Sequence, residues 1–246
     1  MHMSNKFKRV FAFMTAAAFM AMAAACGRPG PAMNASAADP VYALGEVPQN
    51  ASGNQQGVYY EIFVRAFADS DGDGIGDLNG LISKLDYLND GDPATTGDLG
   101  ITGIWLMPVN ETVSYHGYDV TNYYDINPEY GTLEDFQKLL GEAHKRGISV
   151  IMDLVLNHTS NRHEWFIDSM DPKSPYRDWY RWVGEDTGDY NLKTVVWGHP
   201  VWNKVNGSYY YGIFWSGMPD LNYDNPDVRR EAKSIAAFWL DKGVDG

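Results

Sequence analysis

Apolar residues beyond about position 57 alternate between short continuous runs and sets with helical spacing. Two runs rich in β-branched and aromatic residues span 58–64 and 101–107, and a third, ISVIMDLVLNH, spans 148–158. Short apolar runs of this kind are typical of strands buried on both faces, as in a parallel sheet. Between the first two runs, five apolar residues share one helical face: Leu78, Leu81, Ile82, Leu85 and Leu88. The pattern therefore predicts buried strands joined by helices.

Two further helices are marked by their end signals. Thr132 and Asp135 have the spacing of a capping box. The helix that follows continues through Phe136, Leu139, Leu140 and Ala143 to Gly147. Asn225 caps the other helix, with Pro226 in its first position and Gly243 at its end. This alternation of strands and helices predicts an α/β fold with a parallel sheet or barrel.

The segment 159–224 interrupts this alternation. It has neither helical nor strand periodicity over a useful length and is dense in aromatic residues, most of which we expect to form its own small core. A long segment of this kind is usually functional. Residues 225–246 then return to the earlier pattern, with the capped helix and the first residues of a fourth strand.

The N-terminal region is predicted to be a targeting signal. Positive charges precede an apolar run from Val10 to Ala25, so residues 1–25 have the pattern of a secretory signal peptide. Cys26 follows small residues, as in the bacterial lipobox, where the thiol is lipidated after cleavage. Ordinary cleavage near this point, with an incidental cysteine, is the alternative. Residues 26–56, rich in Pro, Ala, Asn, Gln and Gly, are predicted to be a lipid-anchored flexible tether.

The charge balance agrees with an exported protein. The formal net charge is −13, and no basic patch is present, so we expect no nucleic-acid partner. Because Cys26 is the single cysteine, no intrachain disulfide can form. We expect a monomer exported to a bacterial cell envelope, where the lipid would hold it at the membrane surface, or to the extracellular space.

An acidic loop at 69–77 predicts a calcium site. Its carboxylates recur at every second position between glycines, which lets one tight loop direct several oxygens at one centre. The predicted ligands are the side chains of Asp69, Asp71, Asp73 and Asp77 with the carbonyl of Ile75. Position twelve of the loop is Gly80, where an EF-hand has a bidentate Glu, so a calcium loop of another kind is expected. A solvated acidic turn is the alternative.

Polar residues at the end of the third apolar run mark the candidate site. Asp153, Asn157 and His158 follow the apolar part of that run. The structural interpretation is a hydrogen-bonded Asp and a capping Asn. The functional interpretation is favoured because α/β folds build their sites at the carboxyl ends of parallel strands.

Several separated motifs together resemble the α-amylase family, glycoside hydrolase family 13. The first conserved region of that family reads D-x-V-x-N-H, which matches Asp153, Val155, Asn157 and His158. A second short region matches MPDLN at 218–222, in a form between the oligo-1,6-glucosidase and neopullulanase versions. The acidic loop and the segments 115–119 and 159–166 are also similar to the family, and the motifs occur in the family's order.

The resemblance implies a (β/α)₈ TIM barrel of which this chain holds the first three βα units, with a domain B inserted after strand three. Residues 57–158 would be the first part of the barrel, 159–224 the inserted domain, and 225–246 the third barrel helix with the start of strand four. The resemblance also implies roles for individual residues. Substrate binding is assigned to Tyr118, His158 and His116, structural support of the strand end to Asp153, and a second calcium, present in some members, to Asn157 and Asp220.

The implied activity is retaining hydrolysis of α-1,4-linked glucans such as starch or maltooligosaccharides, with α-1,6 linkages as an open alternative. Retaining glycosidases need a nucleophile and a separate proton donor. The family carries these on strands four and five, so they would lie beyond Gly246, and the chain as given is expected to be an inactive fragment with no catalytic residue of its own. The alternatives are a glucosyltransferase or isomerase such as a trehalose synthase, and a non-enzymatic calcium- or glucan-binding lipoprotein.

Overall fold

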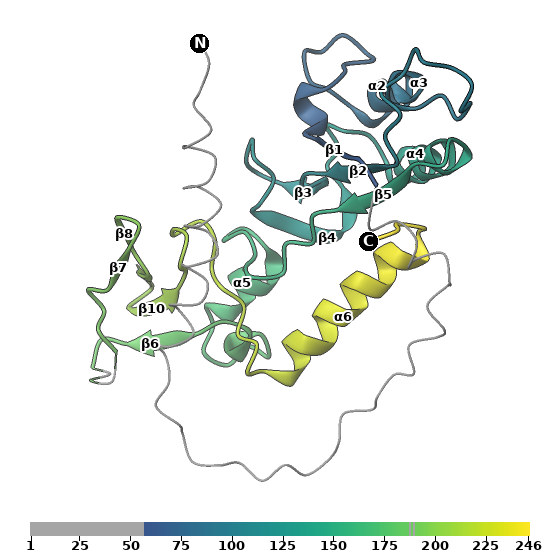
Figure 1. The fold of residues 1–246 in the computed structure, drawn as a ribbon. Helices are drawn as coiled ribbons and strands as arrows, with labels where there is room; N and C mark the ends of the chain where they lie inside the picture. Colours follow the sequence, from purple (N-terminus) through teal and green to yellow (C-terminus); the bar gives the residue numbers. More distant parts are fainter. Residues whose placement is uncertain (1–56, 187, 189) are drawn as a thin grey trace. The chain divides into compact units, whose positions relative to one another are not determined.

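The structure, a computed structural model, describes residues 57–186, 188 and 190–246. The predicted signal peptide, the tether and Cys26 lie outside the described residues. Figure 1 shows the secondary structure of the described part, with β1, β2 and β5 as neighbouring strands.

A parallel sheet forms the centre of the barrel segment. Its strands, in spatial order, are β1 (Tyr59–Ile62), β2 (Gly103–Leu106) and β5 (Ser149–Met152). All pairs are parallel, and the register aligns Tyr59 with Gly103 and Gly103 with Ser149. Each strand is shorter than its predicted run, and only β5 is followed directly by a polar residue, Asp153. The predicted parallel α/β arrangement is confirmed.

The last residues of the chain extend this sheet beyond β5. Asp245 donates its backbone N–H to the Val150 carbonyl at 2.9 Å, and Met152 donates to the Gly246 carbonyl at 3.0 Å. The Asp245 carboxylate also accepts from the Val150 N–H at 2.7 Å and lies 2.8 Å from Nε2 of His144. These bonds continue the parallel hydrogen bonding at the position where a fourth strand is predicted to begin.

The helices between the strands cover the sheet with their apolar faces. The predicted first helix is divided at Ser83 and Lys84 into α2 (Leu78–Ile82) and α3 (Leu85–Leu88), and η2 (Val64–Ala66) is a short 3₁₀ helix after β1. The four leucines of α2 and α3 are fully buried. Helix α4 (Leu133–Lys145) begins with the predicted capping box, in which Thr132 and Asp135 bond reciprocally. The prediction of the capping box is therefore confirmed. The prediction of one continuous helix through Leu78 and Leu88 was wrong.

A β-hairpin between β2 and α4 was not predicted. Its strands are β3 (Asn110–Thr112) and β4 (Val120–Ile126). The register between them shifts twice, on both sides of Glu111, so buried and exposed positions do not alternate regularly. Tyr123 and Ile126 from β4 are nonetheless part of the main core. The hairpin holds the loop 113–119 over the carboxyl ends of the strands.

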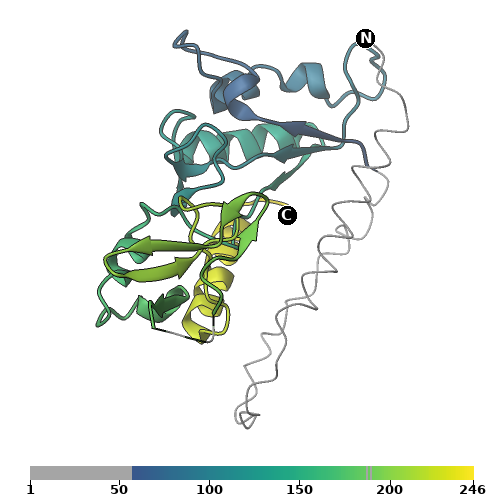
Figure 2. The same ribbon diagram turned by 90° about the vertical axis from the view of Figure 1, so that its left-hand side faces the viewer.

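The inserted segment contains short elements where none of useful length was predicted. Helical pieces are α5 (Glu164–Ser169) and η3 (Arg177–Trp179), and strands are β6 (Trp182–Gly184), β7 (Val195–Val196), β8 (His199–Pro200), β9 (Trp202–Val205) and β10 (Ser208–Tyr211). Strands β6, β10 and β9 form an antiparallel sheet, which Figure 2 shows in green. Phe166, Tyr180 and Tyr210 pack in a small core of the segment, as expected from its aromatic content.

Helix α6 (Pro226–Asp241) returns the chain to the barrel. Asn225 caps it by accepting from the Asp227 N–H at 2.8 Å, with Pro226 in the first position, as predicted. Ile235 and Trp239 are buried in the main core, and the Trp239 indole donates to the Tyr123 carbonyl at 2.8 Å. Within the described residues, no helix has the length and apolarity that crossing a bilayer requires.

Candidate functional site

The Asp153 carboxylate is the polar centre of the strand ends. It follows β5 directly, and its backbone N–H bonds to the Leu106 carbonyl of β2 at 3.0 Å. One oxygen accepts from the Trp105 indole N–H at 3.0 Å, and the other accepts from the Tyr118 hydroxyl at 2.8 Å. Asp153 thus joins two strands to the loop above them. Burial, followed by the bond to Asp153, raises the pKa of Tyr118 to about 12, so the phenol remains a donor at neutral pH.

His158 lies beneath this loop as a neutral imidazole. It is 4% exposed, and burial lowers its pKa. Its Nε2 lies 3.0 Å from the Tyr118 carbonyl, and its Nδ1 lies 3.2 Å from the amide nitrogen of Asn157. These partners place the proton on Nε2 and make Nδ1 the acceptor. Tyr123 donates its hydroxyl to the His158 carbonyl at 2.6 Å, which fixes the backbone as well.

Internal hydrogen bonds shape the loop that carries Tyr118. His116 Nδ1 accepts from the Tyr118 N–H at 3.0 Å, and the two rings lie 6.0 Å apart between centroids. Asp119 accepts from the hydroxyls of Thr112 and Ser114. Gly117 has φ +82°, and a Cβ there would lie 3.0 Å from the Pro108 carbonyl oxygen. The loop therefore holds Tyr118 in a fixed position, with His116 acting within the turn.

The inserted segment returns to the same strand end. His158 and Asp220 form an antiparallel bridge, and the Leu221 N–H donates to the Asn157 carbonyl at 2.9 Å. The Asp220 carboxyl accepts from the Ile213 N–H at 3.1 Å and from the Asn157 side chain. Burial raises the pKa of Asp220 to about 6. The structure thus brings together Asn157 and Asp220, the residues assigned to a second calcium.

Aromatic residues from the insert form a wall next to His158. The Phe214 ring meets His158 edge-on, with centroids 5.2 Å apart, and Trp197 stacks on Phe214 at 5.7 Å. Trp197 is 61% exposed and has φ +49°, an uncommon conformation for a non-glycine residue. Both rings are partly open to solvent, so they present apolar faces beside the site.

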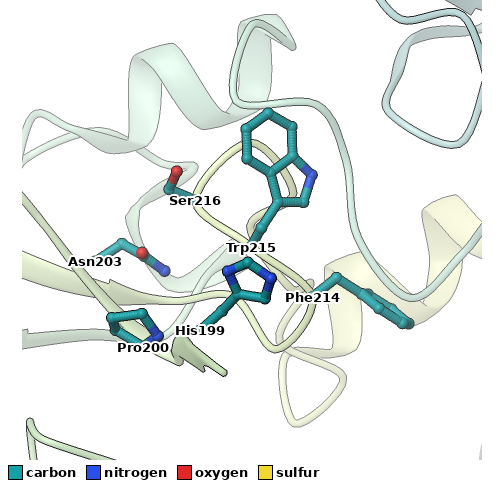
Figure 3. A pocket seen from close by; sticks show the side chains of 6 residues that line it. All are labelled: His199, Pro200, Asn203, Phe214, Trp215 and Ser216. Atoms are coloured by element: carbon teal, nitrogen blue, oxygen red, sulfur yellow. The ribbon is translucent and has the colours of Figure 1, made fainter. Parts of the chain in front are cut away.

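A pocket of about 280 Å³ continues from this wall. Its lining residues, drawn in Figure 3, are His199, Pro200, Asn203, Phe214, Trp215 and Ser216. Figure 3 shows the His199 imidazole and the Asn203 amide turned toward the same space. Within the described part of the chain, the buried amide nitrogen of Asn203 has no hydrogen-bond partner. The pocket therefore combines aromatic faces with a free donor.

The acidic loop brings carboxylates together at the start of α2. Oxygens of Asp69, Asp71 and Asp77 lie within 4.8 Å of one another, and Asp73 is outside this group. Asp69 accepts from the N–H groups of Gly72 and Gly74, which lower its pKa. Asp77 is the N-cap of α2; burial acts to raise its pKa, but hydrogen bonds from Ser70 and Gly80 leave it lowered. Clustered, ionised, hard oxygen donors suit calcium.

Two residues of the site were missed in the sequence. Trp105 lies within an apolar strand, where its side chain looks like a core residue, although it is 38% exposed and bonds to Asp153. Phe214 lies among many aromatic residues of the insert, and its spacing does not distinguish it. The alternation of strand side chains could have indicated that Trp105 and Ile104 face opposite sides. No comparable signal marks Phe214.

Comparison with known proteins shows which family this chain is similar to. The model of the family described as alpha amylase, catalytic domain, matches residues 61–246. Alpha-amylase 3 of Dictyoglomus thermophilum is 55% identical over 190 residues, which cover 77% of this chain and 35% of that protein. Oligo-1,6-glucosidase of Parageobacillus thermoglucosidasius is 46% identical, covering 78% and 34%. The chain spans about a third of the length of these relatives.

Solved structures agree with the sequence comparison. The alpha-amylase from H. orenii superposes with a TM-score of 0.71 at 62% identity, covering 77% of this chain and 39% of that one. A mutant of the trehalulose synthase MutB gives a TM-score of 0.69 at 42% identity, covering 76% and 33%. The predicted fold class is confirmed: the described residues form the first part of a (β/α)₈ barrel, with an insert after its third strand.

Proposed function

We propose, from the premise that this chain belongs to the α-amylase family, that the protein is a glycoside hydrolase acting on α-glucans. The observation that carries the proposal is the set of contacts joining Tyr118, Asp153 and His158 at the carboxyl ends of β2 and β5. Sites of (β/α)₈ enzymes are built at this end of the barrel. The specific substrate that we propose is an α-1,4-linked glucose oligosaccharide. An α-1,6-linked oligosaccharide is the alternative.

Tyr118 is proposed as the platform for the sugar ring. Its ring is half-buried, and its hydroxyl and carbonyl are both bonded to protein groups, so the side chain cannot rotate freely. A rigid aromatic face offers apolar area to the C–H face of a pyranose at a small cost in conformational entropy. Trp105, which is partly exposed, bonds to the other oxygen of the Asp153 carboxylate that accepts from the Tyr118 hydroxyl.

We propose that His158 acts chiefly by holding the Tyr118 backbone in place. Both ring nitrogens have protein partners and the residue is 4% exposed. Direct contact with a substrate therefore requires a sugar hydroxyl to replace the Tyr118 carbonyl as the acceptor from Nε2. The same bond holds the Tyr118 backbone in place before substrate arrives. His116 supports the turn and contributes to the same edge of the site.

Bond cleavage by retention needs two further carboxyl groups about 5 Å apart. Asp153 is engaged by two donors, and Asp220 accepts from the Ile213 N–H and the Asn157 side chain. We therefore assign positioning to this chain and propose that the nucleophile and the proton donor come from later strands of the family's barrel. Positioning alone contributes substantially to catalysis when the reacting groups are present.

Hydrolysis of maltotriose by the intact gene product tests the proposal. Tyr118→Ala should reduce kcat/KM by at least about tenfold, because the platform for the ring is lost. Tyr115→Ala is the matched control, since Tyr115 is 66% exposed in the same loop. Equal activity of Tyr118→Ala and the control would contradict the assignment, as would the absence of any reducing sugar from all α-glucans tried.

A glycosyltransferase or isomerase is a second candidate. Similar proteins include the trehalose synthase/amylase TreS of Mycolicibacterium smegmatis, at 42% identity over 208 residues. The aromatic wall of Phe214 and Trp197 favours this alternative, because apolar side chains beside a reacting sugar limit the access of water. Product analysis separates the two: free glucose indicates hydrolysis, and isomerised or elongated saccharides indicate transfer.

We further propose that the loop 69–77 binds calcium. The closely placed oxygens of Asp69, Asp71 and Asp77 supply part of the coordination, with Asp73 and the Ile75 carbonyl as the remaining predicted ligands. Without a cation, the charges of these ionised carboxylates repel one another. The pair Asn157 and Asp220 offers few donors by comparison, because no third carboxylate or imidazole of the described residues joins it. A second calcium there would depend on main-chain and water oxygens.

The proposed location is the bacterial cell envelope, through lipidation of Cys26, or the extracellular space. This proposal depends on the sequence pattern of residues 1–26. Two acyl chains anchor a protein stably where one does not, so the proposed anchor carries two acyl chains. We also propose that the protein associates with the membrane surface through this anchor and that it is a monomer.

A further inference from the structure

A second, larger cavity lies where the β3–β4 hairpin, the start of α5 and the second turn of α6 meet. Its volume is about 470 Å³. It includes none of the residues Tyr118, Asp153, His158 and Phe214 in its lining. The residues that matter here are Glu111, Arg162, His163, Glu164, Trp165 and Glu231. The volume lies within the range of cavities that hold small organic ligands.

His163 places a hydrogen-bond donor at this cavity. The residue is 5% exposed, and its Nδ1 accepts from the Trp165 N–H at 3.1 Å. Burial lowers its pKa to about 4, so the ring is neutral near pH 7. Because Nδ1 is an acceptor, the neutral ring carries its proton on Nε2. No group among residues 57–186, 188 and 190–246 accepts that proton, and His163 lines the cavity.

The charged groups of the cavity also have unused capacity. Glu231 uses one oxygen to accept from the Tyr124 hydroxyl at 2.6 Å, and Glu111 uses one to accept from the Asn122 amide at 3.2 Å. Their second oxygens have no bond to other described residues. Arg162 and Glu164 form no side-chain hydrogen bond or ion pair within the described part, although they line the same cavity. The cavity therefore offers several acceptors and two kinds of donor.

We propose that this cavity is a second saccharide site, which binds a short neutral α-glucan segment. A sugar presents hydroxyls that both donate and accept, which matches carboxylate acceptors next to imidazole and guanidinium donors. Trp165 is the indole of the lining, and its ring packs against Tyr123, His163 and Trp179. The choice of an α-glucan as the saccharide rests on the proposed function, whereas the choice of a neutral polyhydroxyl ligand rests on the lining alone.

Other ligand classes fit the lining less well. Glu111, Glu164 and Glu231 outnumber Arg162, and His163 is neutral, so an anion would meet net repulsion. A metal ion would need carboxylates close together, and the described residues hold such a group only at 69–77. Arg162 also disfavours a metal at this place. A neutral ligand with many hydroxyls avoids both penalties.

Titration calorimetry with a thio-linked maltotrioside, which resists hydrolysis, tests the proposal on the intact gene product. Wild-type protein should bind two equivalents. The double variant Arg162→Ala/Glu164→Gln should bind at this cavity at least about tenfold more weakly, which leaves one equivalent at the same protein concentration. Glu231→Gln is a second variant, and it retains an acceptor for Tyr124. Asp168→Asn, on the exposed side of α5, is the matched control and should bind like wild type.

A single equivalent in wild type, or two unchanged equivalents in both cavity variants, would overturn the proposal. Hydrolysis of maltotriose serves as the independent readout, because the cavity variants should keep the wild-type rate. If the proposed function failed, all variants would lack hydrolysis while the second equivalent still depended on Arg162 and Glu164. Loss of the equivalent assigned to Tyr118 in a Tyr118→Ala variant, with the other retained, would support two separate sites.

Discussion

Replacement of Tyr118 by Phe removes one hydroxyl from the centre of the site and keeps the aromatic ring. The deleted bond is the 2.8 Å donation to the Asp153 carboxylate. A hydrogen bond to a charged group contributes about 1.5–3 kcal/mol when protected from water. Tyr118 is only half-buried, so screening reduces the expected loss of unfolding free energy to about 1 kcal/mol. The Trp105 indole still donates to Asp153, so the carboxylate keeps a partner.

The same bond makes stability depend on pH in a defined direction. The pKa of Tyr118 is raised to about 12 from its ordinary value of 10.0, first by burial and then by Asp153. At a pH between these two pKa values, Tyr118 has lost its proton in the unfolded chain and keeps it in the folded chain. The contribution of Tyr118 to the unfolding free energy is therefore complete below pH 10 and is lost as the pH rises toward 12. The Tyr118→Phe variant lacks this part of the alkaline destabilisation.

Urea unfolding at pH 8 and pH 11 measures both effects. Tyr115→Phe is the control, because Tyr115 is exposed in the same loop, and it should stay within about 0.5 kcal/mol of wild type at pH 8. A double-mutant cycle with Asp153→Ala should give a coupling energy of about 1 kcal/mol. An unfolding free energy for Tyr118→Phe equal to wild type at both pH values would refute the reasoning.

Three other changes give separate tests. Asp71→Asn should abolish most of the rise in melting temperature that calcium produces in wild type, and Asp73→Asn, outside the close group, should have a smaller effect; equal chelator responses in all three proteins would contradict the site. Cys26→Ser should move the protein from the detergent phase to the soluble fraction, and wild-type protein found only in the soluble fraction would exclude the anchor. Thr132→Ala should lower the unfolding free energy by about 1 kcal/mol through loss of the α4 cap, as measured in urea; no change would mean that the cap contributes nothing.

Local signals in the sequence predicted much of the barrel segment. Thr132 and Asp135 bond to each other within one turn, so their spacing alone identified the cap. The apolar runs located β1, β2 and β5, although most of β1 and Trp105 of β2 are exposed. The break between α2 and α3 was missed because their leucines continue one helical face across Ser83 and Lys84.

The site was predictable only in part. Asp153 and His158 attracted notice as polar residues after an apolar strand. Their partners are distant: Trp105 is 48 positions from Asp153. Phe214, which meets His158, lies near the end of the insert in the sequence. The hairpin escaped notice because shifts in register on both sides of Glu111 remove the regular alternation that identifies a strand. Periodicity describes a single element and carries no information about such pairings.

The two ends of the insert lie next to each other on the strand end. Thr159 donates its N–H to the Pro219 carbonyl at 3.1 Å, and Leu221 donates to the Asn157 carbonyl at 2.9 Å. A segment that leaves and re-enters a scaffold at one point can change in length at a modest entropic cost, because closure entropy grows only slowly with loop length. Evolution could therefore exchange this segment as a module while the barrel strands stay in register. Chimeras that carry the corresponding segment of a relative would offer a direct way to vary specificity on an unchanged barrel.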